Sequence, residues 1–347
     1  MSVKRLFNLK GNTAAQVMQA LVAVTRAQGK LPLHTIHRDT LHALEQHVLR
    51  SGVDIDSLDG ELPEGLAAEL PDEDLRRTVI HLAVVLPFLE SEHQRERAAT
   101  LQTLANSLNI EDTWVDDAQR AARGHYLRLA LHCMREVRTL TNSTLRSELT
   151  EIAKSALRID ADAETQAQYA ALESLPADSM GRELLRYYSD NGFERPGNAG
   201  SWQSRLFFNH DIAHVLGGYD TSPQGEFGVE AFIAGSTSGD LVGYAALIMF
   251  QFQIDVAIDP TVPSWKDQFD PDIYFQGLEH GVACTFDLGN PELEAWPMMG
   301  ESLGALRERL GLPAEGAMVG SLSDPWCGSM GPPKDRVSPN RRPSKIG

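Results

Sequence analysis

Two histidines and an aspartate in the second half of the chain have types and a spacing that suit a metal site. His210, Asp211 and His214 stand at positions i, i+1 and i+4 of the segment SRLFFNHDIAHVLGG. Helical residues advance by about 100°, so these offsets place the three side chains on one face of a helix. Imidazole nitrogens and carboxylate oxygens are ligands of Zn²⁺ and of comparable first-row metals. The pattern therefore predicts a divalent metal on this face, with Zn²⁺ as the first choice.

The surrounding residues predict two elements that meet at this site. Apolar residues fill the remaining positions of the first helix, and Gly217-Gly218 supplies its stop. The polar loop YDTSPQG then reverses the chain, and Glu226 opens a second segment in which Glu230 lies one turn further on. This second segment is expected to bring a fourth ligand back to the metal. The apolar residues of the first helix are Leu206, Phe207, Ile212, Val215 and Leu216.

The His-Asp-x-x-His string by itself is also compatible with other structures. A capped, hydrogen-bonded surface helix can contain two histidines at i and i+4 beside an acid. Zinc proteases carry His-Glu-x-x-His, and Asp211 is one methylene shorter than the glutamate that acts there as general base, so a protease is disfavoured. Four protein ligands normally close a zinc site, although a carboxylate can shift to admit a substrate. Both a catalytic and a structural metal are open at this point.

The composition predicts a folded protein without a disulfide framework. The 347 residues are 42% hydrophobic and 23% charged, which lies within the globular range. The net charge of -17 disfavours nucleic-acid binding, because an acidic chain repels phosphate backbones. The cysteines Cys133, Cys284 and Cys327 lie far apart, which favours a reducing, cytoplasmic compartment. The most apolar stretches, 79–89 and 241–252, are shorter than the about 20 residues that a membrane-spanning helix needs.

Apolar residues at three- and four-residue steps predict an all-α fold with two helical domains. The first domain is expected over residues 1–158, with helices at 13–28, 37–50, 73–89, 93–108 and 112–158, the last broken near 139–142. A shift in composition at 160–180 predicts the start of the second domain, which is expected over residues 174–330. The tail, 331–347, is rich in Pro, Ser and basic residues and is expected to be disordered.

Two similar helical hairpins are expected in the first domain, at residues 14–48 and 75–108. The pair resembles the TerB-like domain associated with tellurite resistance, in which each hairpin places a small acidic turn between its helices. The second turn, Glu90-Ser91-Glu92-His93, is acidic, whereas the first has Gln28-Gly29 in place of Asp-Gly. Some TerB-like domains bind metal through these turns. Metal binding is disfavoured here, because the first turn lacks the oxygen ligand that a hard cation prefers.

The complete pattern in the second half resembles the signature of the fourth coenzyme Q biosynthesis protein family. It reads His-Asp-x-x-His, then eleven residues at 215–225, then Glu226. The likeness covers residues 174–313, including the segments SLPADSMGRELLRYYSDNGFERPG and IYFQGLEHGVACTFDLGNPELEAWPMMGESLGALRERLGL. It implies a mostly helical protein of ubiquinone production that associates with the membrane and with other pathway enzymes. It also implies that the metal ligands are His210, Asp211, His214 and Glu226.

The reaction linked to this family is oxidative decarboxylation of a prenylated hydroxybenzoate ring, in which a hydroxyl replaces the carboxyl group. A metal would anchor the substrate carboxylate as a Lewis acid. Asp211 and Glu226 are the catalytic candidates, with Asp211 as an acid or base beside the metal. No flavin or nicotinamide fingerprint is present, so an oxidation would use the metal, dioxygen or a partner. Residues 241–254, with Met249 and Phe250, are expected to form either a channel for the prenyl chain or, more simply, a core helix.

Two rival functions are compatible with the same residues. In one, the metal is structural and the protein is a non-catalytic scaffold that holds prenylated or quinone-type lipids and biosynthetic enzymes together. In the other, the chain is a tellurite- or stress-response helical protein without chemistry. The TerB-like domain would recruit or regulate, and self-association is compatible with each function. We expect a cytoplasmic location, with peripheral contact to the inner face of the membrane for a lipid-handling protein.

Overall fold

The computed structural model describes residues 3–141, 161–199, 201, 205–237, 241–256, 264–290 and 293–317. Every regular element in these ranges is a helix, and two isolated backbone bridges, Ser179 to Ser302 and Ile254 to Lys266, extend into no strand there. The predicted all-α fold class is therefore confirmed. The tail predicted to be disordered, 331–347, lies outside the described residues.

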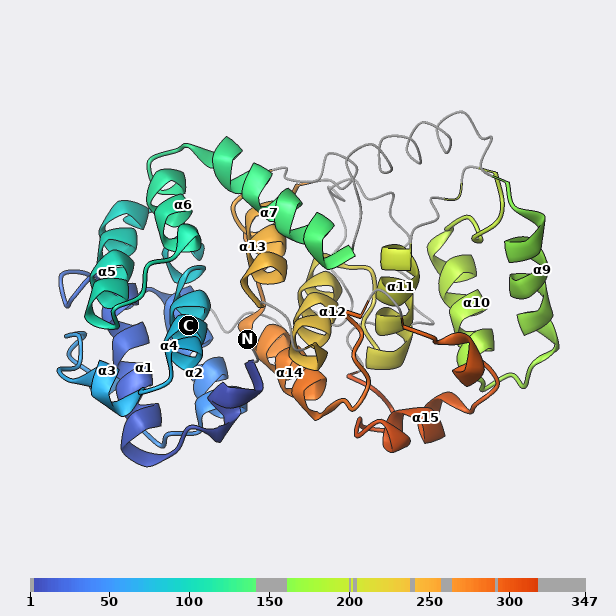
Figure 1. The fold of residues 1–347 in the computed structure, drawn as a ribbon, viewed down its shortest axis with the longest axis horizontal. Helices are drawn as coiled ribbons and strands as arrows, with labels where there is room; N and C mark the ends of the chain where they lie inside the picture. The colour runs from blue at the N-terminus through green and yellow to red at the C-terminus, as the bar shows by residue number, and fades with distance from the viewer. Residues whose placement is uncertain are drawn as a thin grey trace.

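The first half of the chain packs around one buried helix, α1 (Gly11–Thr25), as Figure 1 shows. Residues on every side of its second half are buried, including Val17, Leu21 and Val24, and a helix that is apolar all round belongs in a core. The helices in contact with α1 are α2 (Thr35–Leu44) with its continuation η2 (Glu45–Leu49), α3 (Leu66–Glu69), α4 (Glu73–Ala83) and α5 (Gln94–Ser107). Helix α6 (Thr113–Ala121) packs on α5, and α7 (Tyr126–Thr141) packs on α6.

Most of the predicted helices of this half are present, and two of them are broken where a local residue requires it. The helix expected at 73–89 ends at Ala83, and a separate short turn, η4 (Leu86–Phe88), contains Pro87, which lacks the amide that a longer helix would need. The helix expected at 112–158 is interrupted at 122–125; of the break expected near 139–142, residues 139–141 are helical, and 142–158 lie outside the described residues. Gly124 has a φ of 87° there, a conformation that favours glycine and ends α6, and α7 then runs without a break through Thr141.

The second half forms a further group of helices that flank α12 in Figure 1. Polar side chains start several of these helices by accepting backbone N–H bonds, among them Asp162, Ser179, Ser222 and Asp270. The helices are α9 (Ala163–Ala171), α10 (Met180–Asn191), α11 (Arg205–Gly217), α12 (Pro223–Ser236), α13 (Leu241–Phe252), α14 (Pro271–Ala283) and α15 (Leu303–Arg309).

Glycines let α12 and α14 approach each other closely. A Cβ atom added to Gly281 would lie 2.2 Å from the carbonyl oxygen of Phe232, and one added to Gly277 would lie 2.5 Å from the carbonyl oxygen of Gly228. No side chain fits in these gaps, so backbone packs directly on backbone. This crossing fixes the position of α12, the helix that carries Glu226.

The two halves share one apolar core among the described residues. The rings of Phe88 and Phe250 have centroids 5.0 Å apart. Gln253 donates from Nε2 to the carbonyl oxygen of Leu89 at 2.7 Å and accepts at Oε1 from the backbone amide of Phe269 at 3.0 Å. Helices α2 and η2 also pack on α14, and α7 packs on α13. The division into domains at 1–158 and 174–330 stays a prediction.

Helix α13 lies in this core. Met249 and Phe250 are buried, and Ala245 and Met249 line a cavity of about 20 Å³ with Leu44, Leu86 and Tyr274. This volume is near that of a single water-sized probe, so the cavity is too small for a prenyl chain. The geometry favours the core interpretation of these two residues over the channel. Within the described ranges, no helix has both the length and the hydropathy needed to cross a membrane.

Candidate metal centre

Helix α11 is held firmly at its C-terminal end, one turn after its two histidines. The last carbonyl oxygens of a helix have no partner inside it. The buried guanidinium of Arg307 supplies one, since it donates to the carbonyl oxygens of Leu216 at 2.9 Å and Val215 at 2.8 Å. Gly218 then turns the chain with a φ of 78°, as the predicted Gly-Gly stop requires.

The loop after α11 returns the chain to the same site and starts α12. Ser222 caps this helix by accepting from the amide of Gly225 at 3.1 Å, and Pro223 takes the first helical position, where its missing N–H costs nothing. Glu226 consequently lies in the first turn of α12, where the helix dipole favours a negative charge, and Glu230 lies one turn later.

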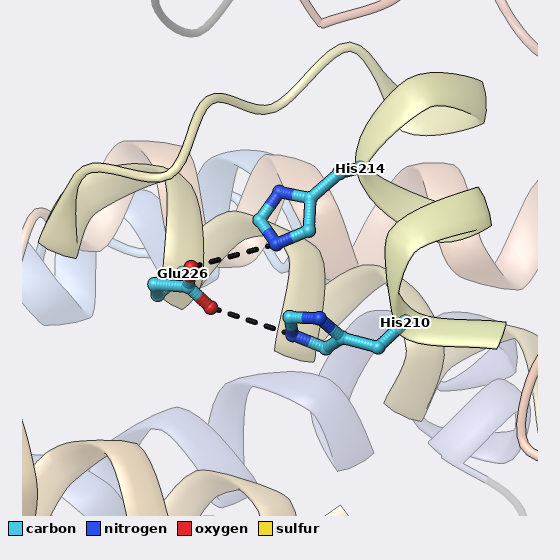
Figure 2. Close-up of side chains that lie close together, drawn as sticks. All are labelled: His210, His214 and Glu226. Atoms are coloured by element: carbon cyan, nitrogen blue, oxygen red, sulfur yellow. Dashed lines mark ion pairs between the residues drawn. The ribbon is translucent and has the colours of Figure 1, made fainter. Parts of the chain in front are cut away.

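Three of the four predicted ligands come together between these two helices. Figure 2 shows His210 and His214 on α11 both pointing toward Glu226 on α12. His210 Nε2 lies 3.4 Å from Glu226 Oε2, and His214 Nε2 lies 3.5 Å from Glu226 Oε1. One donor atom from each residue can be chosen so that all three lie within 4.8 Å of one another.

Glu230 lies beside one of these three residues, His210. Its Oε1 atom is 3.5 Å from His210 Nε2, so His210 lies between two carboxylates of α12. The side chains are largely withdrawn from solvent: His214 is 0% exposed, Glu230 12%, Glu226 16% and His210 21%. The partial exposure of His210 leaves one side of the cluster accessible.

The contact between His210 and Glu226 favours the charged form of both side chains. Burial opposes protonation of His210, but hydrogen bonds to Glu226 and Glu230 outweigh it and hold the pKa of that imidazole well above its ordinary value. Burial likewise opposes ionisation of Glu226, yet the charge of His214 and the contact with His210 hold the pKa of its carboxyl well below the usual range. The carboxylate is therefore ionised at neutral pH and available as a ligand.

The unpartnered atoms of the cluster fit a metal. Within the described residues, His214 Nε2 and Glu230 Oε2 are buried and have no hydrogen-bond partner, which is costly unless something else satisfies them. Zn²⁺ binds nitrogen and oxygen at about 2.0 to 2.2 Å, so neighbouring donors of a tetrahedral site lie about 3.3 to 3.6 Å apart. Each single histidine–glutamate contact of 3.4 or 3.5 Å falls in that range, while donor atoms taken one from each of the three residues lie within 4.8 Å of one another. Nitrogen and carboxylate donors in this number suit zinc.

Asp211 lies apart from the three-residue cluster. Its Oδ2 accepts a hydrogen bond from the hydroxyl of Tyr188 on α10 at 2.6 Å. Burial raises the pKa of Asp211 above its ordinary value, against the opposing effect of this hydrogen bond. Around the axis of α11, Asp211 lies about 100° from His210, which is enough to direct its carboxylate to α10. His214 lies only about 40° from His210, so the two imidazoles stay side by side.

Sequence reasoning did not identify three contacts that shape the site. Tyr188 holds Asp211, and the backbone carbonyl of Tyr219 accepts from His214 Nδ1 at 3.2 Å. The ring of Tyr187 also stacks on His214, with centroids 5.3 Å apart and an interplanar angle of 25°. The adjacent tyrosines 187 and 188, within the segment that carries the family resemblance, were the available signal, but nothing in the sequence indicates which helix packs beside α11.

Comparison of the chain with protein-family models, with curated proteins and with solved structures found no match in any of the three.

Proposed function

We propose that this protein binds one divalent first-row cation, with Zn²⁺ as the best fit, through His210, His214 and Glu226, and uses it in chemistry on a carboxylated aromatic compound. The observation that carries the proposal is the buried Nε2 atom of His214. It has no hydrogen-bond partner among the described residues, and it faces Glu226 at 3.5 Å. A metal would satisfy this nitrogen and both oxygens of Glu226 together.

The residues of the chain would prepare and hold this centre. Tyr219 fixes the proton of His214 on Nδ1, and Glu226 faces both imidazoles, so the three donors converge before any ligand arrives. When bound, a divalent cation supplies Lewis-acid stabilisation of a substrate carboxylate and of charge on ring oxygens. Asp211, oriented by Tyr188, is the neighbouring group that we propose as acid or base.

The substrate class that we propose is a prenylated hydroxybenzoate or a related quinone precursor. Support comes from the signature, in which eleven residues separate His214 from Glu226. His214 and Glu226 lie next to each other, because the loop between them reverses the chain and α12 packs against α11. The reaction class that we propose is decarboxylation of the ring. The TerB-like half would recruit or regulate, and the partners would be the membrane surface and other enzymes of the pathway.

A scaffold with a structural metal is the second candidate, and one observation favours it. Two histidines and two glutamates surround the same small region, and four protein ligands normally close a zinc site. In that case the metal would stabilise the contact between α11 and α12, and the protein would organise lipids or enzymes without turnover.

Metal content tests the proposal. Purified protein, stripped with a chelator and reloaded with Zn²⁺, should contain about one equivalent by mass spectrometry of the element. The double variant His210→Ala, His214→Ala should lose it. The matched control is His42→Ala, His93→Ala, which removes two half-exposed histidines of the first half and should retain the metal. Equal metal in all three proteins, or none in the parent, would overturn the proposal.

Glu226→Ala separates the enzyme from the scaffold. For an enzyme, the variant should no longer convert a prenylated hydroxybenzoate, and mass spectrometry of the product measures this conversion. The metal-free variant and the metal-free parent should unfold at similar temperatures. For a scaffold, neither protein should convert the compound, and added Zn²⁺ should raise the unfolding temperature of the parent but not of the variant.

A further inference from the structure

We infer that Glu230, rather than Asp211, is the fourth protein ligand of this metal centre. The inference rests on the proposed function, because it assigns a ligand to the same site. It departs from the ligand set implied by the signature, which contains Asp211 and has no place for Glu230.

The position of Glu230 on α12 supports its role as a ligand. Glu226 and Glu230 are four residues apart, as are His210 and His214 on the facing helix α11, and side chains four residues apart lie on one face of a helix. Two adjacent imidazoles therefore face two adjacent carboxylates. Glu230 Oε1 lies 3.5 Å from His210 Nε2, about the separation of neighbouring donors in a tetrahedral zinc site.

The unpartnered oxygen of Glu230 gives independent support. Its Oε2 atom is buried and has no hydrogen-bond partner within the part of the chain that the structure describes. A carboxylate oxygen removed from water is costly unless it is paired. Glu230 shares this condition with His214 Nε2, and each of the two side chains contacts a different member of the cluster, Glu230 with His210 and His214 with Glu226. A cation bound beside His210 would compensate the buried charge of Glu230.

Asp211 has a different partner. The hydroxyl of Tyr188 donates to its Oδ2 at 2.6 Å, and Tyr188 in turn lies against Tyr169, with ring centroids 5.9 Å apart. The aromatic residues of α9 and α10 thus hold the Asp211 carboxylate on the α10 side of α11. To coordinate the metal it would have to give up this short hydrogen bond. We therefore assign Asp211 no metal-binding role, since its carboxylate is held beside α10 by this hydrogen bond.

Three isosteric or charge-preserving variants test the assignment. Zn²⁺ affinity is measured by competition with a chromophoric chelator for the parent, Glu230→Gln, Glu230→Asp and Asp211→Asn. Glu230→Gln removes the charge, while Glu230→Asp keeps it but shortens the side chain by one methylene. Both Glu230 variants should bind Zn²⁺ at least about tenfold more weakly than Asp211→Asn does. Thermal unfolding of the metal-free proteins identifies any variant that fails to fold.

A second readout reports the ligands directly. The visible absorption of bound Co²⁺ depends on its ligand set, so the spectrum of Asp211→Asn should match the parent and that of Glu230→Gln should differ. Weaker binding or a changed spectrum in Asp211→Asn, with Glu230→Gln like the parent, would overturn the inference. Full affinity in Glu230→Asp and Glu230→Gln would do so as well. A parent that binds no metal would instead contradict the proposed function, so the two failures are distinguishable.

Discussion

His214 donates a hydrogen bond from Nδ1 to the carbonyl oxygen of Tyr219 at 3.2 Å. Because a carbonyl oxygen can only accept, this bond places a proton on Nδ1, so in the neutral imidazole Nε2, which faces Glu226 Oε1 at 3.5 Å, can act as a ligand atom for a metal. Histidines that bind metals are usually oriented in this way by a partner of the other ring nitrogen. Here the partner is the backbone of the turn that ends α11, so the turn and the site depend on each other.

Gly281→Ala tests how far the site depends on the crossing of α12 and α14. The new Cβ would lie 2.2 Å from the carbonyl oxygen of Phe232, so the helices must separate. We expect a loss of about 1 to 3 kcal/mol in the free energy of unfolding. Zn²⁺ affinity should also decrease, because α12 carries Glu226. Chemical denaturation and chelator competition measure the two effects.

The matched control is Gly300→Ala, since Gly300 has no atom within 4 Å of its added Cβ and has no positive φ. It should change stability by less than about 0.5 kcal/mol. Equal stability of the Gly281 and Gly300 variants would show that the close helix approach is not required.

Tyr188→Phe tests the hydrogen bond to Asp211. The variant leaves a buried carboxylate without its hydroxyl donor, so the free energy of unfolding should fall by about 1 to 3 kcal/mol. In an Asp211→Asn background the same substitution should cost less, because the charged acceptor is already gone. Denaturant unfolding of the four proteins of this cycle gives the coupling. Strict additivity would mean that the two side chains do not interact.

His37 should make stability depend on pH. Its Nε2 lies 2.9 Å from the carbonyl oxygen of Leu86, and burial, followed by the charge of Arg97, lowers the pKa of His37 to about 3. An unfolded histidine has a pKa near about 6.5, so the unfolded chain binds more protons between these values, and stability falls as pH falls through this window. The loss attributable to His37 between pH 7 and pH 5 should be about 2 kcal/mol.

Two measurements check this expectation. His37→Gln, which keeps a donor for Leu86, should show a smaller decrease in stability from pH 7 to pH 5 than the parent does. NMR titration of the folded parent should show a neutral His37 imidazole throughout this range. A folded-state titration of His37 near pH 6.5 would contradict the prediction.

Gln253→Leu tests the contact between the two halves. The amide of Gln253 joins the carbonyl oxygen of Leu89 to the backbone amide of Phe269, and leucine would leave both backbone groups buried and unpaired. We expect a loss of about 1 to 3 kcal/mol. Because the halves share a core, the parent and the variant should each unfold in a single calorimetric transition. Gln102→Leu, at a partly exposed position, is the control and should be within about 0.5 kcal/mol of the parent.

Local patterns in the sequence were sufficient for the fold class and for part of the candidate site. The steps of three and four residues in α1 predict a helix, and burial of Val17, Leu21 and Val24 follows from the same apolar pattern. The spacing of His210 and His214 places them on one helix face without any knowledge of the partner helix. Gly218 and Ser222 indicate where α11 stops and where α12 starts, because their preferences are local.

Contacts between distant segments required the tertiary structure. The offset of about 100° between Asp211 and His210 is compatible with both side chains facing one site. In the structure, α10 packs beside α11, and the hydroxyl of Tyr188 holds the Asp211 carboxylate instead. Likewise, the position of Glu230 next to His210 depends on the crossing of α11 and α12. Helix periodicity determines which residues share a face, but it does not determine which helix packs against that face. The choice of partner depends on how well whole helix surfaces fit, as in the close approach of α12 and α14 at their glycines. The sequence by itself therefore determined the helices and the candidate donors, while the packing of α10, α11, α12 and α14 decided which donors meet.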